Sequence, residues 1–238
     1  MVRVKGRLFL RCIQCGRMHQ VDMDTTDMQC DSWTYDRPMG PGVEYSFRGS
    51  LECRCGSIIN ISVDGSEYPI GSVEMEAPEI EGAEYTELPH LEVEYEYDSD
   101  ECDVYRDSRS TNAIESIILS MSPRDFEMFV GSIFVDYGYD DVFVTQRTRD
   151  GAFDFEATEI RHGIRNLIIG ECKHYSPSHK VGDEIIRKLH DAQYEKHANT
   201  AMVVTSSTFT RDAKERARQY GMTLWDINDL IRYGSHLL

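Results

Sequence analysis

Residues 167–173 read Leu-Ile-Ile-Gly-Glu-Cys-Lys, an apolar run that ends in the pattern Glu-x-Lys. The apolar start predicts a buried strand, and Asp154 lies before it on a second predicted strand. Glu171 and Lys173 are two residues apart, so on a strand both side chains project from the same face. Two carboxylates and one ammonium on adjacent strands can form a metal-dependent site that cleaves phosphodiester bonds.

Strands and helices alternate on both sides of this run, which predicts a mixed α/β sheet flanked by helices. Ser122-Pro123 opens a helix with a cap and an early proline, an apolar stripe from Phe126 to Tyr137 follows at helical spacing, and Gly138 ends it. The apolar run 201–205 is too short for a helix and predicts a central parallel strand. The other expected strands are 142–147, 152–158, 166–173 and 222–225, and the other expected helices are 181–197, 210–220 and 227–233.

The candidate site has a defined division of roles. Mg²⁺ prefers carboxylate oxygens, which Asp154 and Glu171 would supply, and the backbone carbonyl of Cys172 could add another ligand. Lys173 could orient or deprotonate the attacking water, and desolvation that lowers its pKa would help it act as a base. The bland alternative is that these three charged groups are surface ion-pair residues. For Cys172, a buried strand cysteine is the simpler reading than an activated thiol.

The residues around the site, in order, resemble the Mrr family of restriction endonucleases over about residues 120–233. The matching stretches are Ser-Pro-Arg-Asp-Phe-Glu (122–127), Gly-Tyr (138–139), Thr-Arg-Asp-Gly-Ala-Phe-Asp (148–154), Glu-Cys-Lys-His-Tyr (171–175), Val-Val-Thr-Ser-Ser-Thr-Phe-Thr (203–210), Ala213, Ala217 and Gly-Met-Thr-Leu (221–224).

The resemblance implies a PD-(D/E)xK nuclease fold, Mg²⁺-dependent cleavage of DNA and, in many members, recognition of modified bases. By matching position, Asp154, Glu171 and Lys173 inherit the catalytic roles, and Glu127 matches a helix glutamate that can complete the acidic cluster. The chain departs from the family twice. Ala152-Phe153 replaces the usual Gly-Ile, and Glu171 stands where the family often has Gln, which favours metal binding.

Five of the seven cysteines lie in the first third of the chain, where they predict a metal site. Cys12-x-x-Cys15-Gly and Cys53-x-Cys55-Gly are two tight turns within strand-like sequence, and four thiolates from two such turns bind Zn²⁺ tetrahedrally. The second turn is one residue shorter than the usual C-x-x-C, so Cys30 or His19 could replace one ligand. The alternative is four buried reduced cysteines. This part resembles a zinc ribbon in outline only.

The chain therefore divides into two expected domains. Residues 1–105 form a small N-terminal all-β zinc-binding domain that ends in an acidic segment, and residues 106–238 form the nuclease domain. The net charge is −17, with 42 Asp and Glu against 25 Lys and Arg. Residues 74–105 hold no Lys or Arg, which predicts a solvated acidic edge. A sharper hypothesis is that this run mimics phosphate over the DNA cleft, and a salt-loving source would also explain the acidity.

Other patterns limit the function. The chain has no apolar run long enough for a membrane helix and no apolar signal core at its start, so a cytoplasmic location is expected. P-loop, G-x-G-x-x-G, H-E-x-x-H and G-x-S-x-G motifs are absent. The sequence thus predicts an endonuclease that acts on DNA, in defence against foreign or modified DNA, as a homodimer because two strands need two sites. A regulatory partner could bind the N-terminal domain. The alternatives are a repair or junction nuclease and a non-catalytic binding module that retains the fold.

Overall fold

The computed structural model describes residues 2–24, 29–33, 42–67, 73–85, 90–95, 111–145 and 153–238. It divides the chain into two compact units, one of residues 1–15 and 19–106 and the other of residues 16–18 and 107–238. The predicted linker 98–109 and the motif residues 148–152 lie outside the described residues. Within the described part of the chain, none of the helices has the length and apolar character that crossing a membrane requires.

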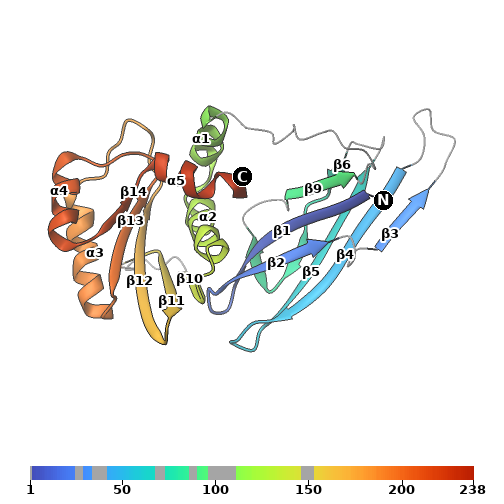
Figure 1. Ribbon diagram of the computed structural model, residues 1–238, viewed down its shortest axis with the longest axis horizontal. Helices are drawn as coiled ribbons and strands as arrows, with labels where there is room; N and C mark the ends of the chain where they lie inside the picture. The colour runs from blue at the N-terminus through green and yellow to red at the C-terminus, as the bar shows by residue number, and fades with distance from the viewer. Residues whose placement is uncertain are drawn as a thin grey trace. The chain divides into compact units, whose positions relative to one another are not determined.

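The second unit is built on a five-stranded mixed sheet in the order β10-β11-β12-β13-β14 (Figure 1). β10 to β12 pair antiparallel, whereas β13 pairs parallel with both β12 and β14. This arrangement confirms the mixed α/β sheet and the parallel strand over 201–205, whose side chains are buried because helices cover both faces of the sheet. The strands are β10 (Asp141–Val144), β11 (Phe155–Arg161), β12 (Ile164–Lys173), β13 (Thr200–Thr205) and β14 (Thr223–Trp225).

Helices cover both faces of this sheet. In Figure 1, α3 and α4 lie on one face, and α2 and α5 lie on the other. The Ser122 side chain accepts a hydrogen bond from the Asp125 amide at 3.1 Å and starts α2, and Thr210 caps α4 in the same way. The helices are α1 (Thr111–Ser120), α2 (Pro123–Asp136), α3 (Asp183–Lys196), α4 (Arg211–Tyr220), α5 (Ile227–Gly234) and a final 3₁₀ turn (Ser235–Leu237).

The apolar stripe of α2 is buried as predicted except at its end. Phe126 and Ile133 are fully buried, whereas Tyr137 is 55% exposed because α2 has already ended at Asp136.

Gly170 has a packing role on β12. A Cβ there would lie 2.0 Å from Cε1 of Phe155, so only glycine lets this ring cross the strand. The close crossing brings the start of β11 against the end of β12.

The first unit is all-β, as predicted, and consists of two small sheets that share one core. One sheet has the order β2-β1-β8, with β9 also paired to β1, and the other has the order β3-β4-β5-β6, with β7 also paired to β5. Leu8 and Leu10 of β1 pack in one cluster with Phe47 of β4 and Ile61 of β5. The strands are β1 (Val2–Cys12), β2 (Met18–Asp24), β3 (Gln29–Trp33), β4 (Gly42–Glu52), β5 (Ile58–Glu67), β6 (Val73–Met75), β7 (Glu79–Glu81), β8 (Ala83–Tyr85) and β9 (His90–Tyr95).

The part of the acidic stretch whose side chains are described faces solvent. Glu74, Glu79 and Glu81 are exposed, as a solvated edge requires. Glu84 has an additional role, because its carboxylate lies 3.3 Å from Nη1 of Arg11, whose side chain is almost completely buried. At least one glutamate of the stretch therefore pairs with a buried cation of the same unit.

Candidate active site and cysteine cluster

Strand pairing places Asp154 beside the Glu-x-Lys run. The Asp154 amide donates to the Gly170 carbonyl at 2.8 Å, directly before the pairing of Phe155 with Gly170. The carboxylate of Asp154 turns back across the strand, and its Oδ2 accepts a hydrogen bond from the Cys172 amide at 2.7 Å. Asp154 is thus fixed by the backbone of the strand that carries the other two residues.

Glu171 and Lys173 form an ion pair on the same face of β12, as the two-residue spacing predicts. Their side chains are 17% and 21% exposed, so the pair lies at an accessible but largely desolvated edge. Lys173 Nζ also donates to the Cys172 carbonyl at 3.3 Å. The Thr205 hydroxyl of β13 donates to the Lys173 carbonyl at 2.7 Å, which fixes the end of the strand.

Glu171 is electrostatically destabilised as an anion. Burial raises its pKa from 4.5 to about 7, and the negative charges of Asp154 and, more weakly, Glu127 act in the same direction. The hydrogen bond and the charge of Lys173 oppose the rise without cancelling it. A carboxyl group in this state gains from a cation that neutralises it, which is the electrostatic condition of a divalent metal site.

The expectation that desolvation lowers the pKa of Lys173 is wrong. Burial does act downward, but the hydrogen bond to Glu171 and the negative charges of Glu171 and Asp154 outweigh it and raise the pKa. Lys173 therefore keeps its proton. It can orient a water molecule and offset phosphate charge, whereas this arrangement gives no support to a role as a base.

Glu127 reaches the same neighbourhood from α2. Its Oε2 accepts a hydrogen bond from Nη1 of Arg124 at 2.8 Å, and the same nitrogen donates to the Thr145 carbonyl at 2.8 Å. Arg124 thereby ties the glutamate to the segment after β10. Sequence reasoning gave Arg124 no role, although its position three residues before Glu127 on a helix was a signal for such a pair.

Two residues after the metal motif differ in their surroundings. His174 is engaged within the unit, since its Nε2 lies 3.1 Å from the Ile118 carbonyl and its ring packs against Phe126. Lys180 is exposed and open to contact a phosphate. The Cys172 thiol is buried, and burial raises its pKa well above the usual range, which confirms the reading as a core cysteine rather than an activated thiol.

The donor set at this edge fits one Mg²⁺ ion. Asp154 and Glu171 offer two carboxylates and Cys172 offers a backbone carbonyl, and Mg²⁺ in proteins is commonly held by one or two carboxylates plus waters. Among the described residues, the four cysteines are the one group of three or more side chains close enough to enclose a metal. Glu127 is accordingly an electrostatic neighbour of the pair in this conformation rather than a third ligand.

The four cysteines of the first unit come together. Their sulfur atoms all lie within 4.8 Å of one another, with Cys12 and Cys55 3.8 Å apart and Cys15 and Cys53 3.6 Å apart. A tetrahedron with Zn–S bonds of about 2.3 Å has edges of about 3.8 Å, so these spacings fit a tetrathiolate zinc site. They are far longer than a disulfide bond of about 2.05 Å.

The turn at Cys53 and Cys55 closes although it is one residue shorter than the usual C-x-x-C. The Gly56 amide donates to the Cys53 carbonyl at 2.8 Å, and Gly56 adopts a φ of 88°, which a residue with a side chain rarely does. His19 is not among the clustered residues, and the side chain of Cys30 lies outside those described. The cluster thus needs neither of the two substitutes that the sequence allowed.

Comparison with known proteins finds a family model that matches the second unit. Residues 118–233 match the Mrr_cat family model, described as a restriction endonuclease, which confirms the resemblance over about 120–233. No curated protein matches the chain. Among solved structures, the DNA modification-dependent restriction endonuclease AspBHI is 22% identical with a TM-score of 0.45, over 54% of this chain and 36% of that protein.

Two further structures are similar at lower identity. The MspJI restriction endonuclease in complex with a 27-mer oligonucleotide is 15% identical with a TM-score of 0.42, over 54% of this chain and 33% of that protein. A repair endonuclease from Pyrococcus abyssi is 13% identical with a TM-score of 0.30, over 94% of this chain and 87% of that protein. The chain spans about a third of the length of the two restriction enzymes.

Proposed function

We propose that this chain, whose residues 118–233 form a domain of the restriction-endonuclease family, is a Mg²⁺-dependent endonuclease that hydrolyses DNA phosphodiester bonds. The observation that supports this most strongly is the state of Glu171. A carboxyl group whose pKa is raised to about 7 beside Asp154, at an accessible strand end, is suited to bind a divalent cation.

Asp154, Glu171 and the Cys172 carbonyl would hold the ion. Bound Mg²⁺ would supply positive charge for the phosphate oxygens and a water of lowered pKa. Asp154 keeps its position through the hydrogen bond from the Cys172 amide, so it need not be ordered when substrate arrives. Lys173, protonated and held on Glu171, donates toward the scissile phosphate and offsets the negative charge that develops there.

The biological role that we propose is defence against foreign or modified DNA, with the enzyme acting as a homodimer. The family of residues 118–233 supports the first part. The need to cut two strands of opposite polarity supports the second, because a two-fold axis presents two equivalent sites to the two strands.

In the first unit, we propose that Cys12, Cys15, Cys53 and Cys55 bind one structural Zn²⁺ ion. Three of the four sulfurs lie on residues that are buried or half-buried, and no fifth position is left open to substrate in a tetrathiolate site. The metal would join the turn between β1 and β2 to the turn between β4 and β5. It would thereby stabilise a small all-β unit by constraining its two turns.

Cleavage of methylated and unmethylated plasmid DNA tests the nuclease function. We expect the purified protein to nick or linearise at least one of the two substrates in Mg²⁺ and to leave both intact in EDTA. The Asp154→Ala variant should be inactive on both. Cleavage that persists in EDTA, or no cleavage of either substrate in Mg²⁺, would contradict the proposal. A preference between the two substrates would report whether a modified base is recognised.

A further inference from the structure

Helix α4 has an unusual charge for this chain. It carries four basic residues against two acidic ones, Asp212 and Glu215, whereas the other described α-helices are neutral or negative. The chain as a whole has a net charge of −17. A local excess of positive charge on such a chain identifies the surface where an anion can approach.

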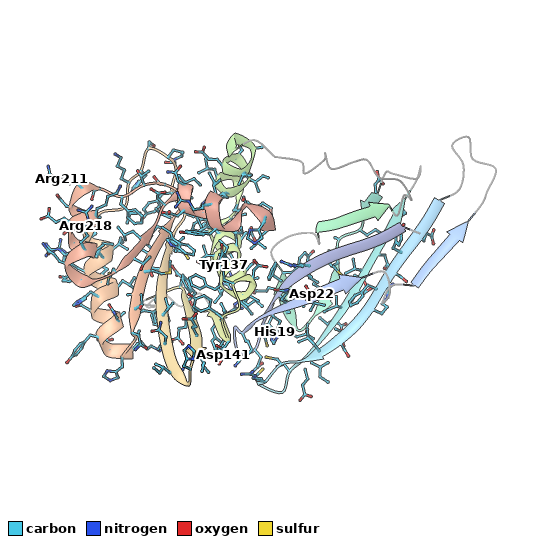
Figure 2. The ribbon with its side chains drawn as sticks, in the orientation of Figure 1. His19, Asp22, Tyr137, Asp141, Arg211 and Arg218 are labelled. Carbon is cyan, nitrogen blue, oxygen red and sulfur yellow. The ribbon has the colours of Figure 1, made fainter. Side chains whose placement is uncertain are left out.

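Three of these basic residues form one continuous face. Arg211, Lys214 and Arg218 are three and seven positions apart, so they project from the same side of the helix over about 10 Å. All three are exposed, and none of them has an ion pair or side-chain hydrogen bond with the described residues. Figure 2 shows Arg211 and Arg218 pointing away from the body of the unit. Arg216, in contrast, lies 4.0 Å from Asp183.

The same face borders two hollows in the surface. One, of about 460 Å³, is lined by Phe209, Glu215 and the three basic residues. The other, of about 310 Å³, adjoins it through Lys214 and Arg218 and also includes Asp226 and Asp229. These two aspartates accept backbone N–H groups at the start of α5, and the positive end of that helix offsets their charge.

A short, hydrogen-bonded loop connects this face to the catalytic strand. β12 and β13 run parallel with Lys173 opposite Thr205, so both strands end at the same edge of the sheet. After β13, five residues lead to Arg211. Two backbone hydrogen bonds tie this loop to Val181, the residue two positions before α3: the Val181 amide donates to the Thr208 carbonyl, and the Thr210 amide donates to the Val181 carbonyl. The start of α4 is therefore held at the edge of the sheet where Lys173 lies.

We propose that Arg211, Lys214 and Arg218 form a binding surface for the phosphate backbone of DNA, which holds the duplex beside the catalytic edge. This inference rests on the proposed nuclease function. Affinity for DNA comes mainly from Lys and Arg contacts to phosphates, and these contacts fix the position of the protein on the duplex. Two guanidinium groups suit phosphate because each can donate two parallel hydrogen bonds. A cation cluster of this kind lets a strongly acidic chain admit a polyanionic substrate.

The test compares two triple variants with equal loss of charge. The first variant carries Arg211→Gln, Lys214→Gln and Arg218→Gln. The matched control carries the same change to glutamine at Arg165, Lys196 and Arg232, which are exposed elsewhere on the same unit. Binding to a fluorescein-labelled duplex is measured by anisotropy in Ca²⁺, between about 50 and 200 mM KCl. Cleavage of plasmid DNA in Mg²⁺ is measured in parallel.

We expect the α4 variant to bind at least tenfold more weakly than the control, and the slope of log K against log salt to fall by about 2 to 3, or roughly 0.9 for each lost phosphate contact. Equal affinity and equal salt slope in the α4 variant and the control would overturn this inference, even if wild type cleaves DNA normally. A wild type that binds the duplex but does not cleave it would overturn the nuclease function alone. A wild type that neither binds nor cleaves would overturn both.

Discussion

Replacing Glu171 with glutamine should change how the stability of the second unit depends on pH. In the folded, magnesium-free protein the pKa of Glu171 is about 7, against 4.5 for an unperturbed glutamate. The folded state therefore keeps a proton that the unfolded chain releases between these two values. Because the folded pKa is raised, the stabilisation is present in full below pH 4.5 and is lost as pH rises through 7.

The size of the effect follows from the shift. A difference of about 2.5 units at about 1.36 kcal/mol per unit gives about 3 kcal/mol, most of it lost between about pH 5 and pH 8. The side chain of Glu171 is 17% exposed, so solvent screens little of this energy. Glutamine has the same shape and cannot ionise, so the variant should not show the loss. The attraction of Lys173 for the ionised carboxylate is already contained in this shift, because it is one of the causes that set the pKa of Glu171.

Urea unfolding followed by the fluorescence of Trp225 measures the free energy of unfolding of the second unit. Trp225 belongs to β14, and a Trp33→Phe background removes the only other tryptophan. The difference in free energy of unfolding between the Gln variant and wild type should shift by about 2.5 kcal/mol in favour of glutamine from about pH 5 to pH 8. Glu184→Gln, at an exposed site of α3, serves as the control and should show no shift.

A single result would refute the reasoning. If the Gln variant and wild type differ by the same free energy at both pH values, the Glu171 carboxyl is not electrostatically destabilised, and the argument for a cation beside it fails. Added Mg²⁺ extends the test. It should stabilise wild type at about pH 8 and have little effect on the Gln variant, since the ion binds only the ionised carboxylate.

Three further perturbations test other parts of the account. Lys173→Ala should lower the single-turnover cleavage rate by about 10²-fold or more while leaving the affinity for DNA in Ca²⁺ nearly unchanged; full activity would remove Lys173 from the mechanism. Gly170→Ala should destabilise the second unit by about 2 kcal/mol or more in urea unfolding, because the added carbon meets the Phe155 ring at 2.0 Å; an unchanged midpoint would contradict the close crossing. Cys12→Ser should remove zinc from the purified protein and lower the melting temperature of the first unit, whereas Cys172→Ser should keep the zinc content of wild type.

Local patterns were sufficient to predict most of the second unit. The Ser122 cap, the apolar residues of α2 and the left-handed Gly221 after α4 are each determined within one or two helical turns. The run 201–205 was recognised as a central strand because it is apolar on both faces. Helix α1 was not predicted, since its three isoleucines, Ile114, Ile117 and Ile118, are weak helix formers.

The candidate site shows where sequence reasoning ends. Spacing alone predicted that Glu171 and Lys173 share a face, because the alternation of a strand is a local property. The direction of the Lys173 pKa could not be predicted in this way. It depends on the balance between burial and the charges of Glu171 and Asp154, and the charge of Asp154 enters only through the pairing of β11 with β12.

The cysteine cluster is a similar case. Two turns separated by 37 residues were correctly paired from composition and spacing, and the structure brings all four sulfurs together. The buried Arg11 was not anticipated, since its partner Glu84 lies 73 residues away on a strand within the acidic stretch. Long-range pairs of this kind depend on strand register, which no short pattern encodes.

The most direct test of the central claim is the single-turnover rate of plasmid cleavage in Mg²⁺ by wild type, Asp154→Asn and Glu156→Gln. Glu156 lies two residues further along the chain, on β11, and pairs with Lys196, so its loss controls for a missing carboxylate near Asp154. The account predicts that Asp154→Asn cleaves at least about 10²-fold more slowly than wild type, while Glu156→Gln cleaves at the wild-type rate. Cleavage by Asp154→Asn at the wild-type rate would show that the Asp154, Glu171 and Lys173 edge is not the catalytic centre.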